Sequence, residues 1–511
     1  MSFDALMNKF HAKAQSAMAM GGEEKLAAYK RAGKLNARER VAYLLDQGTF
    51  QEVGLFAYSD MPGVAERSPC DGKITGFGKI DGRPAAVVCN DLTVLGSSSA
   101  NINGKKIGYI KRMADRRGLP VVFLSEAGGA RMPDYMGARR MVAMAQNPTQ
   151  YQRLREAPWA SCLLGPCYGS PTWYASMSDF VVMKKGAVMA VSSPKVTILA
   201  TGEDTPDEEL GGWHVHAEMT GLVDRVAESD EECMDTAKKF LSYLPTNAAQ
   251  LPPRAAVPPG SGAKMARILD YLLQDRRRAY DMRHIIQCIV DGGELFELNA
   301  HFGRAAVTTL ARIDGHTVGI IGNNTMFQAG ALDADACEKI TSFLVLCDSY
   351  NIPIIMLVDT PGFMIGKQGE RKKVTGKIIN FMNALTLATV PKITIIIRKT
   401  YGQAFINMGG GRNSDTIVAW PTAEISFMDP ETGINVVYNL RKEDDPQRFA
   451  EKMKLMALDT EPWGAAGIFN VNDIIDPAQT REWLLSMLDY HHDRRTGGIG
   501  KHLMHCWPTS Y

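Results

Sequence analysis

The sequence predicts an α/β protein made of two similar domains that are related by internal duplication. Four landmarks recur along the chain at a constant spacing of 233 residues, which chance similarity would not produce. They are Asp81-Gly82 with Asp314-Gly315, Pro120 with Pro353, Gly129 with Gly362, and Tyr168-Gly169 with Tyr401-Gly402. Two like domains predict two like sites, one in each half of the chain.

A segment rich in proline and glycine separates the two halves. Residues 251–262 contain four prolines and two glycines, which disfavour both helix and strand. We therefore expect an N-terminal domain over residues 1–250, a linker over 251–262 and a C-terminal domain over 263–511. Helical spacing of apolar residues up to about Gln47 predicts a helical start, and a helix over Met265 to Asp275 is expected to mirror it.

Each half presents the same elements in the same order. They are a hairpin around a DG turn (80–88 and 313–321), a helix (105–117 and 334–350), a buried strand (119–124 and 352–358) with a glycine turn (127–130 and 360–363), a further helix, and a second buried strand (160–164 and 392–397) with its own turn (167–170 and 400–403). This alternation predicts parallel sheets covered by helices. Ligands of such folds lie beyond the carboxyl ends of the strands.

The composition is that of an ordinary globular protein. The 511 residues are 45% apolar and 22% charged, enough for two cores of roughly 200 to 250 residues each. A net charge of +1 argues against a nucleic-acid partner or an anionic membrane, and no apolar run resembles a signal peptide or a membrane span. Nine cysteines predict free thiols in the cytoplasm, and Cys89, Cys162 and Cys167 lie in apolar runs that we expect in the core.

The glycine turns after the strands are the candidate sites of chemistry. Glycine allows a sharp turn, and the free N–H groups at the start of the following helix can bind an anionic oxygen. A single glycine here could simply close a turn, but matched positions in both halves favour anion binding. The candidates are Gly128, Gly129, Ala130 and Gly169 in the first half, and Gly362 and Gly402 in the second.

Side chains that could act as acids, bases or metal ligands are scarce. No Walker A, HExxH or GxSxG sequence occurs, and no GxGxxG follows a strand. His214 and His216 could form a metal pair, but without a carboxylate partner we interpret them as structural, and we predict no metal. Glu126 and Asp359 end equivalent strands and could be general bases, although we expect them to cap the next helix. The pattern favours stabilisation of oxyanions by backbone N–H groups.

Several segments, in order, resemble the carboxyltransferase (β) subunit of biotin-dependent acyl-CoA carboxylases, particularly those of the propionyl-CoA and acetyl-CoA type. They are SEAGGAR (125–131), LGPC (164–167), ELGG (209–212), LSYLP (241–245), NIP (351–353), VDTPGF (358–363) and AWPTAE (419–424). The likeness extends from GKLNARER (33–40) to the C-terminal region. The resemblance implies two crotonase-like domains, each a ββα spiral.

The reaction of this family would explain two similar sites. Its members move CO2 from carboxybiotin, carried on a separate subunit or domain, to the α-carbon of an acyl-CoA. The enolate oxygen of the substrate and the ureido oxygen of biotin both carry negative charge, so each can be held by paired amides. The resemblance implies Gly169 and Ser170 for the enolate, where relatives commonly have Gly-Gly, and Gln403 and Ala404 for biotin, where relatives commonly have Gly-Ala.

This chain departs from its relatives around the expected pocket. Ile406 stands where propionyl-type enzymes tend to carry Asp, at a position that lines the acyl pocket. Tyr168 is bulkier than the family's small residue, and the segments 132–137, 170–173 and 427–431 also differ. The stretch from about Asn323 to Asp359 is similar to the family's acyl-CoA-binding region. These departures favour an acyl group other than acetyl or propionyl.

The resemblance also implies an assembly. We expect a homo-hexamer, a trimer of dimers, in which the N-terminal domain of one subunit meets the C-terminal domain of its neighbour. The chain has no biotinylation sequence and no ATP-grasp region, so a biotin carboxylase and biotin carboxyl carrier subunit are expected partners. Two alternatives remain: a decarboxylase or transcarboxylase subunit that runs the half-reaction in reverse, and a non-catalytic scaffold that binds biotin carriers.

Overall fold

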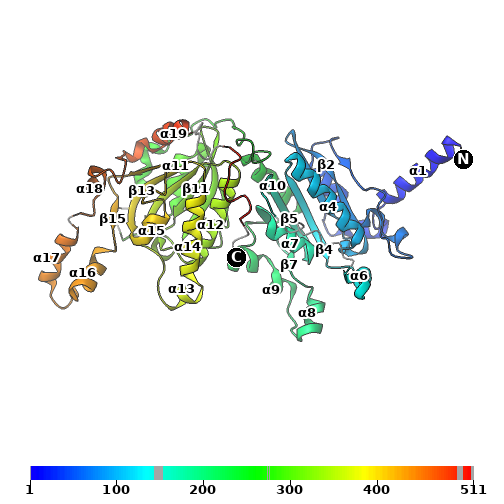
Figure 1. The fold of residues 1–511 in the computed structure, drawn as a ribbon, viewed down its shortest axis with the longest axis horizontal. Coiled ribbons are helices and arrows are strands. Elements are labelled where there is room, and N and C mark those ends of the chain that lie inside the picture. The colour runs from blue at the N-terminus through cyan, green and yellow to red at the C-terminus, as the bar shows by residue number, and fades with distance from the viewer. Residues whose placement is uncertain are drawn as a thin grey trace. The chain divides into compact units, whose positions relative to one another are not determined.

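The computed structural model describes residues 2–142, 153–272, 274–275, 277–457, 459–491 and 499–507. The chain divides into two compact units, Met1–Ala249 and Gln250–Tyr511, and each contains one eight-stranded sheet (Figure 1). Residues 251–262 form neither helix nor strand. Within the described residues, no helix is long and apolar enough to cross a membrane.

The first unit combines ten α-helices with its sheet in the described part of the chain. The helices are α1 (Phe3–Met18), α2 (Glu23–Arg31), α3 (Ala37–Leu44), α4 (Asn101–Arg117), α5 (Met132–Tyr135), α6 (Ala138–Val142), α7 (Ser170–Met177), α8 (Pro194–Thr201), α9 (Asp207–Gly211) and α10 (Asp230–Tyr243). The strands are β1 (Gln51–Glu52), β2 (Lys73–Ile80), β3 (Arg83–Asn90), β4 (Val121–Gly128), β5 (Trp159–Tyr168), β6 (Phe180–Lys184), β7 (Val188–Ala190) and β8 (Arg225–Ala227).

The second unit follows the same plan. Its helices are α11 (Met282–Ile289), α12 (Ala334–Ser349), α13 (Lys367–Arg371), α14 (Val374–Leu387), α15 (Gly402–Asn407), α16 (Pro430–Tyr438), α17 (Pro446–Ala457), α18 (Pro462–Gly467) and α19 (Thr480–His491). Its strands are β9 (Phe296–Leu298), β10 (Ala306–Ile313), β11 (His316–Asn323), β12 (Ile354–Thr360), β13 (Lys392–Tyr401), β14 (Thr416–Ala419), β15 (Glu424–Ser426) and β16 (Asp473–Ile474).

The two sheets have the same topology. The strand order is β1-β2-β3-β4-β5-β6-β8 in the first unit and β9-β10-β11-β12-β13-β14-β16 in the second, with β7 and β15 pairing with β5 and β13. Each sheet begins with an antiparallel hairpin, β2–β3 or β10–β11, and continues in parallel through the following strands. The predicted α/β class and the internal duplication are confirmed.

The hairpin turns show the duplication at atomic detail. Asp46 accepts hydrogen bonds from the backbone N–H groups of Asp81 and Gly82, and Asp291 accepts the equivalent pair from Asp314 and Gly315. Asp81 and Asp314 both have positive φ angles, 50° and 51°, a strained conformation for a residue other than glycine. The carboxylates compensate for this strain in both units.

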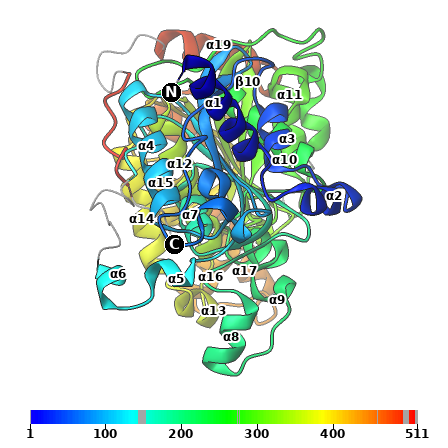
Figure 2. The same cartoon turned by 90° about the vertical axis from the view of Figure 1, so that its right-hand side faces the viewer.

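Helices cover both faces of the first sheet (Figure 2). Successive residues of β3 point to opposite faces. Val88 packs with Ile110 of α4 and Tyr174 of α7 on one face, whereas the thiol of Cys89 donates to the carbonyl of Ala37 in α3 on the other. The same alternation predicts from sequence alone which face each residue occupies.

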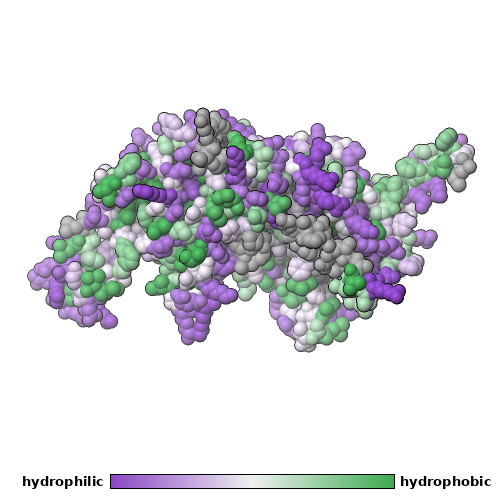
Figure 3. Space-filling model, viewed as in Figure 1, coloured by the Kyte–Doolittle hydropathy of each residue, from purple (hydrophilic) through white to green (hydrophobic). Residues whose placement is uncertain are grey.

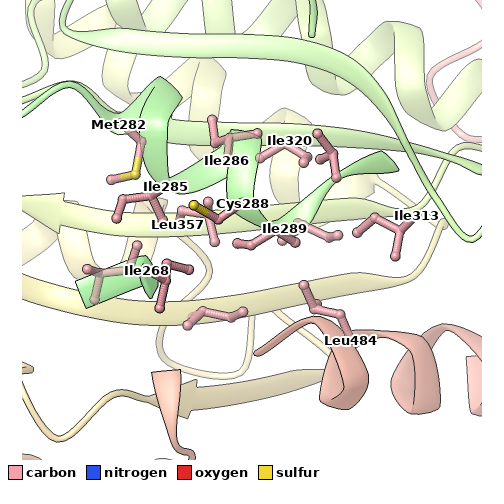
Figure 4. Close-up of a cluster of buried hydrophobic side chains, with 14 of the residues drawn as sticks. Ile268, Met282, Ile285, Ile286, Cys288, Ile289, Ile313, Ile320, Leu357 and Leu484 are labelled. Carbon is pink, nitrogen blue, oxygen red and sulfur yellow. The ribbon is translucent and has the colours of Figure 1, made fainter. Parts of the chain in front are cut away.

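The core of the second unit lies around α11. Figure 4 shows Met282, Ile285, Ile286 and Ile289 of this helix pointing into a cluster of aliphatic side chains from the sheet, with Leu484 of α19 at its edge. All five side chains are 1% exposed or less, so their burial removes most of their apolar surface from water.

The expected helix over Met265 to Asp275 is only partly correct. A 3₁₀ helix spans Met265–Tyr271 and ends there. Met265 and Ile268 of this helix, and Leu272 just after it, are buried in the core of the second unit, while most of the other residues face solvent. Residues three apart share a face of a 3₁₀ helix, so this short segment places both Met265 and Ile268 in the core.

Candidate active site at two glycine turns

The first turn joins β5 to α7. Gly169 has φ 71° and ψ −119°, a conformation that favours glycine, and its carbonyl accepts hydrogen bonds from the N–H groups of Thr172 and Trp173. Ser170 is the first residue of α7, so its own N–H has no acceptor within the helix. Both Gly169 and Ser170 are half-buried and remain accessible to a ligand.

A second glycine turn of the same unit lies directly against the first. A Cβ on Gly129 would be 3.7 Å from the Cβ of Tyr168, and a Cβ on Gly169 would be 3.9 Å from the Cα of Gly129. Gly128 pairs with Tyr168 across the parallel strands, and Ala130 follows at the same edge of the sheet. The fold thus brings the candidates of the first half together.

Tyr168 is anchored away from these amides. Its side chain is buried, and its hydroxyl donates a 2.8 Å hydrogen bond to Asp207 at the start of α9. Burial, together with this hydrogen bond, raises the pKa of Tyr168. Tyr401, its counterpart, donates in the same way to Glu424. The repetition indicates that both tyrosines fasten the segment following the turn.

The equivalent turn of the second unit joins β13 to α15. Gly402 has φ 58°, and a Cβ there would lie 3.0 Å from the carbonyl oxygen of Phe427, so glycine fits best. Gln403 and Ala404 belong to the first turn of α15, where N–H groups lack intrahelical acceptors. The side chain of Gln403, an exposed residue, donates to Asn407 along its own helix, whereas Ala404 is fully buried.

The remaining second-half candidates lie after the end of the neighbouring strand β12 and on α15. Gly362, with φ 132°, follows the end of β12, which pairs in parallel with β13. Ile406 is half-buried on α15, and a Cβ on Gly411 would be 3.8 Å from it. Within the stretch 323–359, α12 is almost wholly buried, so the loop before it offers the accessible surface.

The expectation that Glu126 and Asp359 cap helices is wrong. Glu126 is fully buried and accepts hydrogen bonds from Arg40, at 2.7 Å, and from the hydroxyl of Tyr29, at 3.1 Å. Asp359 is fully buried and accepts from Arg398 at 2.8 Å. Both carboxylates are therefore held as the acidic partners of buried ion pairs.

The other side chains considered for chemistry have structural partners. Nε2 of His216 lies 2.7 Å from the carbonyl oxygen of Met189, and Nδ1 of His214 lies 3.6 Å from Glu218. Groups of three or more metal-binding side chains are absent from the described residues. Cys89, Cys162 and Cys167 are buried, and burial raises the pKa of the Cys89 thiol to about 12.

One residue of the first site went unnoticed in the sequence. The N–H of Ser99 donates to the carbonyl of Gly129, and the carbonyl of Ser99 accepts from the N–H of Arg131, both at 2.8 Å. Its hydroxyl also reaches Ser170. Its hydrogen bonds to the glycine turn use only backbone atoms, which every residue type has. The sequence therefore gives no signal for this position. Leu332, which lies 233 residues after Ser99, makes the matching bridge in the second unit, but this match is visible only in the structure.

Comparison with known proteins identifies the family. Residues 28–501 match the carboxyl transferase domain. The chain belongs to this family. It is 33% identical over 502 residues to the propionyl-CoA carboxylase carboxyltransferase subunit of Haloferax mediterranei, covering 96% of each chain. It is 32% identical over 487 residues to the methylmalonyl-CoA decarboxylase subunit alpha of Propionigenium modestum, covering 93% of each.

A solved structure agrees with this assignment along the whole chain. The transcarboxylase 12S protein, described as a hexamer and solved with methylmalonyl-CoA and methylmalonic acid bound, has a TM-score of 0.89 and 32% identity, covering 97% of each chain. The resemblance drawn from the sequence motifs is confirmed, as is the two-domain carboxyltransferase fold.

Proposed function

We propose that the chain is the carboxyltransferase subunit of a biotin-dependent acyl-CoA carboxylase. The observation that carries this proposal is the pair of glycine turns, at equivalent carboxyl ends of parallel strands, each opening a helix with free amides. Membership of the carboxyl transferase family supports it. Two turns of this kind suit a reaction with two oxyanions.

In the first unit, Gly169 and Ser170 would hold the enolate oxygen of the acyl-CoA through their backbone N–H groups. Gly128, Gly129 and Ala130 line the same edge of the sheet and would bound the site. Fixed amides stabilise charge that develops in the transition state, and one such donor is worth about 3 kcal/mol. Glu126 is engaged with Arg40 and is not available to take the α-proton.

In the second unit, Gln403 and Ala404 would hold the ureido oxygen of biotin. Gln403 is exposed, and its side chain is turned along the helix to Asn407, which supports the fit, whereas Ala404 is fully buried within this chain. Carboxybiotin, carried by a partner subunit, would supply the CO2 and an acceptor for the α-proton when bound. Gly402 and Gly362 would let the backbone approach the ring closely.

The acyl group is proposed to be larger and more apolar than acetyl or propionyl. Ile406 beside the second turn is aliphatic, and Phe427 and Ile365, in the loops near it, are 80% and 87% exposed. The exposed ring of Phe427, whose carbonyl faces Gly402, offers apolar surface beside the second turn. Tyr168 would contribute the buried wall beneath the first turn.

A second candidate function is the reverse half-reaction, from a malonyl-type CoA to biotin. The likeness to a methylmalonyl-CoA decarboxylase subunit supports it, because the same two oxyanion sites serve either direction. The intact turns argue against a non-catalytic scaffold, which would require that the amides had lost their geometry.

We propose that the chain works as a hexamer, a trimer of dimers, with a biotin carboxylase and biotin carboxyl carrier partner. Figure 3 shows apolar side chains at the surface, and α8 exposes Val196 and Leu199 without burying any residue. The hexameric transcarboxylase 12S supports this state. Light scattering coupled to size exclusion tests it, and a stable, active monomer would contradict it.

The free thiols support a cytoplasmic location.

The function is tested with free biotin and a panel of malonyl-CoA derivatives whose α-substituent ranges from hydrogen, methyl and ethyl to longer alkyl chains. We expect release of CO2 that requires biotin, measured as the decarboxylated acyl-CoA by chromatography. The control omits biotin and fixes the spontaneous rate. Absence of biotin-dependent decarboxylation with every compound of the panel would contradict both enzymatic functions.

A further inference from the structure

Ser99 connects the two glycine turns of the first unit. Its backbone is bonded on both sides to the turn at Gly129, at 2.8 Å each, and its hydroxyl is 3.0 Å from the hydroxyl oxygen of Ser170. One residue therefore contacts both turns, one through main-chain bonds and the other through its side chain.

The direction of the hydroxyl bond is defined by its geometry. Ser99 is the donor and Ser170 the acceptor, so the proton of Ser170 must point elsewhere. Among the described residues this proton has no acceptor. Ser170 is half-buried beside its own free N–H, so a ligand held by that N–H would also be within reach of the hydroxyl.

The second unit forms its turn without this pair. Leu332 occupies the position of Ser99 and makes the same backbone bridge, its N–H donating to Gly362 and its carbonyl accepting from Met364. Gln403 occupies the position of Ser170, and its side chain bonds to Asn407 instead. The hydroxyl pair is therefore not required to shape a turn of this type.

The loop that carries Ser99 is held rigidly. Ser97 has φ 47° and is fixed by the buried ammonium group of Lys73, whose Nζ lies 2.6 Å from its carbonyl oxygen and 2.8 Å from its hydroxyl. Arg131 donates to the hydroxyl of Ser98 at 3.2 Å and to Asp71 at 2.6 Å. A rigid loop keeps the Ser99 hydroxyl directed at Ser170.

We propose that the hydroxyl of Ser170 is a third hydrogen-bond donor to the enolate oxygen, and that Ser99 is its positioning residue. The inference rests on the proposed function. When the α-proton passes to the ureido group of biotin, or when CO2 leaves in the decarboxylation direction, the charge left behind would move to the thioester oxygen, which would accept hydrogen bonds from the N–H groups of Gly169 and Ser170 and from the Ser170 hydroxyl. No covalent bond to serine forms, and the hydroxyl keeps its proton. Donation from Ser99 polarises the Ser170 O–H and strengthens its bond to the oxyanion.

The test uses the full-length protein, free biotin and whichever malonyl-CoA derivative of the panel above it decarboxylates fastest. We expect Ser170→Ala to lower kcat about tenfold with KM nearly unchanged, because the bond strengthens only as charge develops. Ser170→Thr keeps a hydroxyl and should restore most of the rate. Ser99→Ala should lower kcat about threefold, and the double alanine variant should equal Ser170→Ala, because Ser99 acts through Ser170.

Ser161→Ala is the matched control. Ser161 and Ser178 form another serine hydroxyl pair in the same unit, 2.8 Å apart, at the opposite end of β5. The kcat of Ser161→Ala should match that of the wild type. An unchanged kcat in Ser170→Ala, or a double variant slower than Ser170→Ala, would overturn the inference while leaving the proposed function intact. An inactive wild type would overturn both.

Discussion

Replacing Gly169 by alanine tests the first oxyanion site through its backbone alone. Alanine fits sterically, because the nearest atom to its Cβ would be the Cα of Gly129 at 3.9 Å. The obstacle is the conformation, φ 71° and ψ −119°, which costs a residue with a Cβ about 1–3 kcal/mol. The chain can escape this strain by flipping the peptide between Gly169 and Ser170, which turns the Ser170 N–H away from the site.

The expected magnitude follows from the lost donor. Removal of one oxyanion donor lowers kcat by about 10²–10³-fold. Because the flip relieves the strain, Gly169→Ala should lose activity with only a small loss of stability. The assay is biotin-dependent decarboxylation together with thermal unfolding of the same preparation.

Gly186→Ala is the control for strain without chemistry. Gly186 also has a positive φ, 78°, with open space around its Cβ. The Gly186→Ala substitution should lower the free energy of unfolding by about 1 kcal/mol, or Tm by roughly 2–4 °C for a unit of this size, and should leave kcat unchanged. A Gly169→Ala variant with kcat within about threefold of wild type and the same Tm loss as Gly186→Ala would refute the assigned role of the Ser170 amide.

Three further predictions concern other parts of the chain. Gly402→Ala should raise KM for biotin and lower kcat, because the new Cβ would approach the Phe427 carbonyl oxygen at 3.0 Å. KM for the acyl-CoA should be unchanged. A change in the acyl-CoA KM alone would contradict the assignment of this turn to biotin. Arg398→Met should cost about 3–5 kcal/mol in urea unfolding, because the buried Asp359 would keep only Lys399 as a cationic neighbour, with its Nζ 3.7 Å away, and a loss below 1 kcal/mol would argue against the Arg398 ion pair. Burial lowers the pKa of Lys73 to about 7 from 10.5, so the unfolded state binds more protons at this residue between these values, and Lys73 contributes a rise in stability with pH there; Lys73→Met should remove that contribution and change the slope of stability against pH in urea unfolding.

The order of elements could be predicted from the sequence because it depends on local patterns. Alternating apolar strands, charged helices and DG turns are visible within short windows, and the repeat aligned them in both halves. The strand predicted over 160–164 proved longer, reaching Tyr168. Its last residues pair with β7, for example Pro166 with Val188, and a partner 22 residues further along is not visible locally. β13 extends in the same way by pairing with β15.

The site was predictable where backbone conformation demanded glycine and not where distant side chains met. Positive φ angles occur at Gly129, Gly169 and Gly402. The position of each glycine directly after a predicted strand already suggested such a turn. Glu126 was interpreted as a cap because it and Asp359 end equivalent strands in the two halves. Its partner Arg40 lies 86 residues away and becomes a neighbour only when the chain folds.

The duplication provides an internal comparison between folding and chemistry. Features present in both units serve what the units share, which is the fold and the glycine turns: the buried Lys106 and Lys339, for example, each donate to two backbone carbonyls at or just before the start of β2 and β10. Features present in only one unit are free to serve its particular substrate. The hydroxyl pair of Ser99 and Ser170 belongs to this second class, since the second unit builds the same bridge and turn without it. That asymmetry is the reason to expect a loss of kcat, rather than of stability, when the Ser170 hydroxyl is removed.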